Sequence, residues 1–121
     1  MGNVPRIVRT IARILKEKKA EDILILDMKG LTITDYFIIA TANSTVHAGA
    51  LKDEIERKLE LRGYYPLGIE GIPYNHWILM DYGDVVVHIF HPETRELYDL
   101  ERLWYDAPRY TINEKGEIEE A

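Results

Sequence analysis

The segment formed by residues 76–92 (HWILMDYGDVVVHIFHP) constrains the fold more than any other part of the chain. Two apolar runs, residues 77–80 and 85–90, flank a short polar connection that contains Gly83. Glycine between two β-rich runs indicates a hairpin, because it supplies the positive φ that a tight turn requires. The second run is rich in valine and apolar on both faces, which is typical of an interior strand. The sequence therefore predicts a β-hairpin whose second strand lies near the centre of a sheet.

Side chains along the first hairpin strand alternate between two faces. One face carries Trp77 and Asp81, and the other carries Met80 and Tyr82, with Asp84 beside the turn. A partly exposed tryptophan is the type of residue that anchors an interface, and neighbouring carboxylates favour a partner rich in lysine and arginine. We therefore expect this hairpin to present a binding surface of aromatic and acidic side chains.

Composition limits the class of protein. The 121 residues are 46% hydrophobic and 30% charged, which is typical of a single globular domain. The absence of cysteine excludes disulfides and thiolate chemistry. No apolar run approaches the ~20 residues that a membrane span needs, and the chain begins with a polar segment. We therefore expect a cytoplasmic protein.

The charge is unevenly distributed along the chain. Residues 1–19 contain six basic residues and one acidic residue, which leaves −11 on the remainder because the whole chain carries −6. An acidic body disfavours nucleic-acid phosphate as the main target and favours a basic partner. The alternative is that the acidity only keeps the protein soluble. The basic first segment could be a nucleic-acid arm, although a solvated helix face is the simpler interpretation.

Apolar residues at helical spacing predict two long helices. The first begins near Pro5, with Asn3 as its cap, and ends at about Lys18. The second begins after the capping residue Ser44 and ends at Gly63, a natural helix stop. Two short helical turns are also predicted, over residues 93–98 and 99–104. Their large apolar residues are expected to be mainly buried: Tyr98, Leu100, Leu103 and Trp104.

Strands are predicted over residues 23–26 and 35–40, and over 64–70 near a sheet edge because proline and glycine interrupt that segment. Residues from Arg109 onward are charged and lack a periodic stripe. We therefore expect one domain over 1–109 and a charged, flexible tail over 110–121. The order of elements indicates an α/β fold, in the form of an α+β mixed sheet flanked by helices.

The sequence contains no complete catalytic or metal-ligating motif. His88 and His91 lie three apart on a predicted strand, so their side chains point to opposite faces and cannot share a metal ion. Asp81 and Asp84 flank the turn and could bind a cation or act in acid–base chemistry, but such acids more often favour or solvate the turn itself. Asp27 lies at a strand end but lacks the paired acid of a nucleotidyl-transfer site. We therefore expect no catalytic residue, no metal and no cofactor, and we expect the histidines to be hydrogen-bonded structural residues.

Three separated blocks carry a family resemblance: KKAEDILILDMKGLT, DYFIIATANST and WILMDYGDVVVHIFHPETRELYDLERLW. In order and spacing they closely resemble the Iojap/RsfS ribosomal silencing factor family, over roughly Ile11 to Pro108. The resemblance implies an α/β protein related in fold to nucleotidyltransferases but without their catalytic acids. It also implies a factor that binds ribosomal large-subunit protein fourteen, blocks subunit joining and represses translation, notably when nutrients are scarce. Such factors also assist late large-subunit assembly and often form homodimers off the ribosome.

The resemblance places the binding surface on the hairpin and its neighbours. The implied partner-binding residues are Trp77, Met80, Asp81, Tyr82, Asp84, Glu70 and His91. An aromatic anchor would pack on an apolar patch of the partner, and the acids would pair with its lysines and arginines. Residues 72–76 depart from the acidic or glycine-containing loop that is common in relatives. The basic first helix also lies outside the family pattern and is a candidate contact for adjacent rRNA.

The leading hypothesis is a non-enzymatic factor that binds the large ribosomal subunit and sterically blocks subunit association. One alternative is a degenerate nucleotidyltransferase that uses Asp27, Asp35 or Asp81, and another is an assembly factor for the large subunit. Under the leading hypothesis, Trp77→Ala or Tyr82→Ala leaves the fold intact and weakens large-subunit binding. Binding should also weaken as salt is added, because exposed ion pairs are screened.

Overall fold

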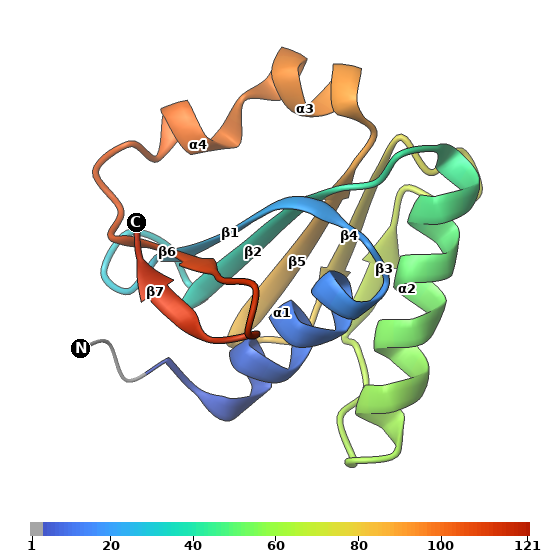
Figure 1. Cartoon of the computed structure of the whole chain (residues 1–121), viewed down its shortest axis with the longest axis horizontal. Helices are drawn as coiled ribbons and strands as arrows, with labels where there is room; N and C mark the ends of the chain where they lie inside the picture. Colours follow the sequence, from blue (N-terminus) through green and yellow to red (C-terminus); the bar gives the residue numbers. More distant parts are fainter. Residues whose placement is uncertain (1–3) are drawn as a thin grey trace.

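The structure, a computed structural model, describes residues 4–121 (Figure 1). Its elements are α1 (Arg6–Glu17), β1 (Glu21–Asp27), β2 (Tyr36–Thr41), α2 (Thr45–Glu60), β3 (Gly68–Glu70), β4 (Trp77–Asp81), β5 (Val85–Phe90), α3 (Pro92–Tyr98), α4 (Leu100–Leu103), β6 (Arg109–Ile112) and β7 (Ile118–Glu120). The strands form one sheet, with α1 and α2 on one face and α3 and α4 on the other (Figure 1). Within residues 4–121, no helix has the length and apolar character needed to cross a membrane.

The seven strands of the sheet are ordered β3-β4-β5-β2-β1-β6-β7. The β2–β5 pair is parallel, and every other neighbouring pair is antiparallel. A parallel pair requires a crossover connection, and α2 lies within the connection between β2 and β5. The arrangement confirms the predicted fold class, a mixed α+β sheet flanked by helices.

The hairpin formed by β4 and β5 has the predicted form. Trp77 lies opposite Phe90, and Asp81 lies opposite Val86. Gly83 adopts a φ of +88° in the turn, and its N–H donates to Asp81 Oδ1 at 2.8 Å. Because β5 lies between β4 and β2, the valine-rich strand is an interior strand, as predicted.

The main core lies between the sheet and the two long helices. From α1 it receives Ile11 and Leu15, and from α2 it receives Leu51 and Ile55, all of which are fully buried. They pack against apolar side chains of β1, β2, β4 and β5. This face of the sheet is therefore sealed by two amphipathic helices, which is where most of the hydrophobic stabilisation resides.

The ends of the long helices follow the capping rules only in part. Ser44 caps α2 as predicted, since its Oγ accepts a hydrogen bond from the His47 N–H at 3.0 Å. At α1 the capping position is Pro5, which makes no side-chain cap. The predicted Asn3 cap lies outside the described residues.

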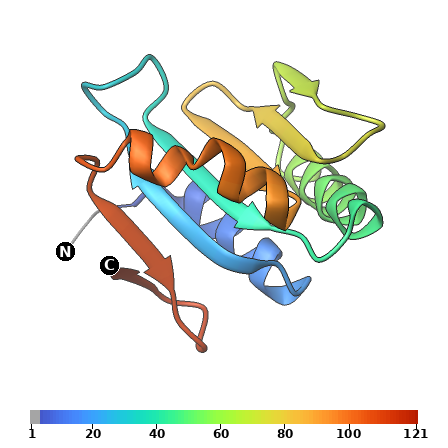
Figure 2. The same ribbon diagram turned by 90° about the horizontal axis from the view of Figure 1, so that it is seen from above.

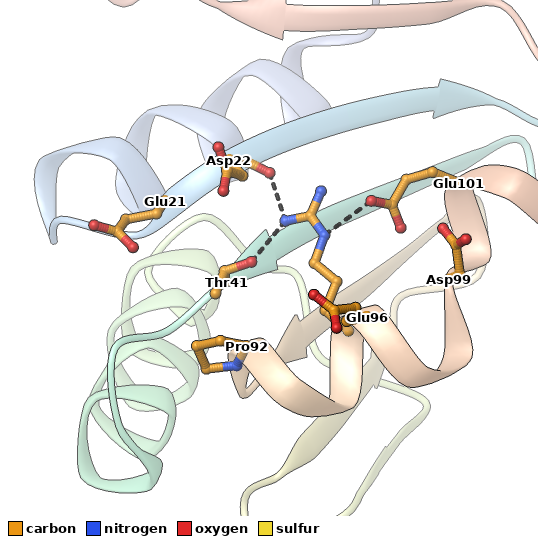
Figure 3. Close-up of a pocket in the computed structure, with 8 residues that line it drawn as sticks. Glu21, Asp22, Thr41, Pro92, Glu96, Asp99 and Glu101 are labelled. Carbon is orange, nitrogen blue, oxygen red and sulfur yellow. Dashed lines mark hydrogen bonds and ion pairs between the residues drawn. The ribbon is translucent and has the colours of Figure 1, made fainter.

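A smaller core lies beneath α3 and α4. Its buried members are Leu26, Met28, Ile39, Phe90 and Ala107. Arg95 of α3 fastens these helices to the sheet. Figure 3 shows its partners Asp22, Thr41 and Glu101. Its Nη1 donates to the Asp22 carbonyl at 2.7 Å and to Thr41 Oγ1 at 2.8 Å, and its Nε donates to Glu101 Oε2 at 3.1 Å. Charged donors make strong hydrogen bonds, so one side chain ties α3 and α4 to β1 and β2.

The expectation of a loose charged segment after Arg109 is wrong where that segment forms strands. β6 pairs with β1, and β7 pairs with β6. Tyr110, Ile112 and Ile118 pack against the main core. Because these few apolar residues are interrupted by charged ones, the segment lacks the dense pattern of a recognisable strand. Residues 109–112 form a strand because they pair with β1, which lies much earlier in the sequence.

Two expectations about burial are also wrong. Tyr98 is 53% exposed and Leu103 is 65% exposed, although both are predicted to be buried. The reason is that α3 and α4 have only seven and four residues, and Leu100 and Trp104 already pack against the smaller core. β3 is an edge strand as predicted, but it begins only at Gly68.

Candidate functional site

The two faces of β4 have different surroundings. Ile78 and Met80 point into the main core and are fully buried. Trp77, Leu79 and Asp81 point to the opposite face and are half-buried. The alternation follows from the two-residue period of a strand. The structure therefore divides the sequence-predicted site between a sealed face and an accessible one.

The accessible side chains of β3, β4 and β5 form one surface, which we call the open face. It contains Glu70, Trp77, Leu79, Asp81 and Val86. Glu70 is paired with Leu79, and Asp81 is paired with Val86, and directly paired residues lie on the same side of a sheet. Figure 2 shows α3 and α4 lying across β1 and β2 while β3 and β4 remain uncovered by them. Half-buried apolar side chains at the centre, with carboxylates at the edges, match the apolar core and polar rim of a protein interface.

Trp77 lies at the border between the open face and the smaller core. Its indole stacks on Phe90 with ring centroids 4.9 Å apart, and the Tyr98 ring lies 4.7 Å away. Its Nε1 donates to His88 Nδ1 at 3.1 Å. The indole is therefore half-buried, with its only polar group bonded inside the molecule. β5 and α3 both pack against the indole, so Trp77 is only partly exposed and its role as an interface anchor stays a prediction.

His88 supports the indole from the neighbouring strand. Its side chain is only 4% exposed, and it lies against the rings of Phe37, Trp77 and Phe90. Because Nδ1 accepts the indole N–H, the neutral ring carries its proton on Nε2. Burial lowers the pKa of His88 to about 4. His88 is thus a neutral, hydrogen-bonded structural histidine, as predicted.

The acids of the turn lie at the far end of β4 from the indole. Trp77 and Asp81 are the first and last residues of the strand, a separation of about 13 Å at the usual rise per residue. Asp81 Oδ1 accepts from the Gly83 N–H, so this acid stabilises the turn. The Asp84 side chain is exposed. The indole and these acids therefore lie at opposite ends of the same strand.

Met80 and Tyr82 belong to the sealed side of the sheet. Met80 is fully buried, so its prediction as a partner-binding residue is wrong. Tyr82 packs against the main core, and its hydroxyl is buried without a hydrogen-bond partner among residues 4–121. Burial, reinforced by the negative charges of Glu56 and Glu60, raises the pKa of Tyr82 to about 12.

Of the other predicted residues, Glu70 is exposed and His91 is half-buried. The His91 ring lies 5.6 Å from that of His76. The sequence analysis missed four exposed apolar residues of the α3–α4 segment: Leu97, Tyr98, Leu103 and Tyr105. The available signal is the number of large apolar residues in helices too short to bury them all. Tyr98 touches Trp77 and so extends the open face towards α3.

Two other candidate residues, Asp27 and His47, have structural partners. Asp27 Oδ1 accepts from the Lys29 N–H at 3.0 Å, and its Oδ2 lies 3.5 Å from Lys29 Nζ. His47 Nδ1 accepts from the Asn43 N–H, and its Nε2 lies 2.7 Å from the Lys18 carbonyl oxygen. Within residues 4–121, no group of three or more histidines and carboxylates is arranged to hold a metal ion.

The molecule is thus an α+β protein whose mixed sheet has one sealed face and one partly open face. The crystal structure of a protein from Chromobacterium violaceum has a similar fold, with a TM-score of 0.78 and 37% identity over 81% of this chain and 82% of that one. The family model for "Ribosomal silencing factor during starvation" matches residues 2–121. The chain belongs to this family, which confirms the resemblance identified in the sequence.

Two curated relatives agree with this assignment. The "Ribosomal silencing factor RsfS" of Bacillus subtilis is 42% identical over 107 residues, which cover 88% of this chain and 91% of the relative. The protein of the same name from Halalkalibacterium halodurans is 41% identical over 103 residues, covering 84% and 86%. Family members are non-enzymatic, ribosome-binding factors. The nucleotidyltransferase alternative therefore loses its support.

Proposed function

We propose that the protein binds the large ribosomal subunit through ribosomal large-subunit protein fourteen and sterically blocks association with the small subunit. The observation that carries the proposal is the open face in a member of the silencing-factor family. The factor would act by occupying a surface that the small subunit needs. Affinity and position then determine its effect on translation, and no chemical turnover is involved.

The chemistry of the open face suits a basic protein with an apolar patch. Leu79 and Val86 offer half-buried apolar surface at the centre. Glu70 and Asp81 add carboxylates on the same side, and the whole chain carries a net charge of −6. Opposite charges on the partner would steer the encounter and fix its orientation. Binding should therefore weaken with added salt.

The proposed contact surface differs from the one that the sequence alone indicates. It keeps Glu70, Trp77 and Asp81 of the open face, with Asp84 and His91 at its two ends. Tyr82 is at most a marginal contact, because it packs against the main core. Tyr98 is added, since it covers part of the indole and is itself more than half exposed. Off the ribosome, the same apolar face would be available to a second copy of the chain.

The direct test is a subunit-joining measurement with purified ribosomal subunits, followed by light scattering. The wild-type protein should reduce joining when it is first mixed with large subunits. Leu79→Arg places a bulky cation in the centre of the open face and should abolish the effect. Val46→Arg, at an exposed position on α2, is the matched control and should behave as wild type.

Two outcomes would count against the proposal. If the wild-type protein pellets with large subunits but leaves joining unchanged, it is not a steric block. An accumulation of large-subunit precursors in a deletion strain, with unchanged joining, would instead favour a role in assembly. If Leu79→Arg inhibits joining as well as Val46→Arg does, the open face is the wrong surface.

A further inference from the structure

A strongly basic hollow lies on the opposite side of the molecule from the open face. It has a volume of about 340 Å³ and is lined by Arg6, Arg9, Thr10, Arg13 and Arg62. We call it the arginine hollow. All four arginines are exposed, and no carboxylate belongs to the lining. Such a concentration of positive charge is unexpected in a chain whose net charge is −6.

The helical spacing explains how the arginines meet. Arg6, Arg9 and Arg13 are three and four residues apart, so they form one stripe along α1, while Ile11 and Leu15 face the core. Arg62 comes from the turn that follows α2. Like charges at this spacing oppose helix formation slightly, so helix stability does not account for the stripe. Arg13 donates a hydrogen bond from Nη2 to the Gly116 carbonyl at 3.5 Å, but within residues 4–121 Arg6, Arg9 and Arg62 make no side-chain hydrogen bond.

Two nearby carboxylates are already paired with other cations, and a third, Glu114, lines a neighbouring pocket together with Arg13. Glu17 lies 3.7 Å from Lys58, and Glu54 lies 3.1 Å from Arg57 and 3.3 Å from Lys58. These pairs leave the hollow itself uncompensated. Among residues 4–121, no carboxylate lies within ion-pair distance of Arg6, Arg9 or Arg62.

We propose that the arginine hollow binds the phosphodiester backbone of RNA. Guanidinium groups present planar, forked donors that match phosphate oxygens. Arg6 and Arg13 are about 10 Å apart along α1, at 1.5 Å per residue, so the stripe is longer than one phosphate group. No aromatic residue lines the hollow, so it lacks a platform on which bases could stack. The contact is therefore with the backbone and is independent of sequence.

The choice of RNA among phosphate-bearing ligands rests on the proposed function, because a factor on the large subunit is surrounded by rRNA. The open face would then engage a ribosomal protein while the arginine hollow, on the other side, engages RNA. Two separate contacts raise the overall affinity if both can form at once. The hollow also accounts for a basic first helix on an otherwise acidic protein.

The first measurement uses a fluorescently labelled RNA hairpin and the full-length protein, with binding followed by anisotropy at several salt concentrations. R9Q/R62Q should bind about 60-fold more weakly than wild type at 0.1 M salt, with a slope of log K against log salt that is smaller by about 1.8, or about 0.9 for each charge removed from a duplex contact. K19Q/R102Q removes the same charge at exposed positions outside the hollow and is the matched control. Thermal melting should show that both variants fold.

The second measurement pellets the same proteins with isolated large subunits. R9Q/R62Q should bind more weakly and with less dependence on salt than K19Q/R102Q. If wild type fails to bind large subunits, the proposed function fails while the hairpin measurement still tests the hollow. Equal hairpin affinities and salt slopes for the two variants would overturn the RNA site. Binding to anionic lipid vesicles but not to the RNA hairpin would overturn the choice of RNA.

Discussion

The two faces of the β4–β5 hairpin are built from neighbouring residues but have different environments. On one face, Ile78, Met80 and Val87 are fully buried in the main core, beneath α2. On the other, Leu79 and Val86 are only half-buried, because α3 and α4 are too short to cover β3 and β4. An apolar strand residue thus supports stability or offers a contact according to what lies over it. Hydrophobicity alone does not distinguish the two.

Adjacent residues of β4 provide the sharpest test of this contrast. Met80→Ala should lower the free energy of unfolding by about 2–5 kcal/mol, because it leaves a cavity in the main core. Leu79→Ala should cost about 1 kcal/mol or less, because its side chain loses little buried contact. Chemical denaturation of both variants measures the difference. Equal losses would mean that the open face is also part of the core.

The stability of the protein should depend on pH through His88, which is buried beside Trp77 and Phe90. Its pKa is about 4 in the folded protein, below the ordinary value of 6.5, so the unfolded chain takes up a proton first as the pH falls. The free energy of unfolding should therefore decrease by about 3 kcal/mol between pH 6.5 and 4 on account of this residue. His88→Gln keeps an acceptor for the indole and should remove that dependence, whereas His47→Gln should retain it. A pH profile of His88→Gln that matches wild type would contradict the assignment.

The hydrogen bonds of Arg95, which join α3 and α4 to the sheet, should determine how stably these two helices cover it. Arg95→Gln removes charged hydrogen bonds to the Asp22 carbonyl, Thr41 and Glu101, and should cost about 1.5–3 kcal/mol. Hydrogen exchange should quicken in α3 and α4 and stay slow in α1 and α2. Arg102→Gln, an exposed position on α4, is the control. Uniform acceleration across both helix pairs would argue against a local clamp.

The smallest effect is expected from Tyr82 on the sealed side. Its hydroxyl is buried without a partner among residues 4–121, so Tyr82→Phe should be neutral or stabilise by up to about 1 kcal/mol. The wild-type protein should also lose stability as the pH rises from 10 towards 12, since the tyrosine ionises first in the unfolded chain. Alkaline denaturation of the two proteins tests both points. A clear loss of stability in Tyr82→Phe would indicate that the hydroxyl has a partner in solution.

Local sequence patterns predict those elements whose type and buried face follow from residue spacing alone. The hairpin, its turn glycine and the Ser44 cap follow from spacing alone, and the alternation along β4 already separates Met80 from Trp77. The prediction for Met80 is wrong because it assigns neighbouring residues of one strand to a single surface, although successive side chains of a strand point to opposite faces. Long-range pairing explains the other misses. The sequence around Trp77 does not show that His88, on the neighbouring strand, accepts the indole N–H. Nor does the sequence of residues 109–112 show that they pair with β1.

The central claim is that the open face, and not the sealed one, binds the ribosome. The most direct measurement is the affinity of purified ribosomal large-subunit protein fourteen for wild type, Leu79→Arg and Val46→Arg. Leu79→Arg alone should lose at least about 2 kcal/mol in binding free energy, roughly 30-fold in Kd. A folded Leu79→Arg that binds as tightly as Val46→Arg would contradict it.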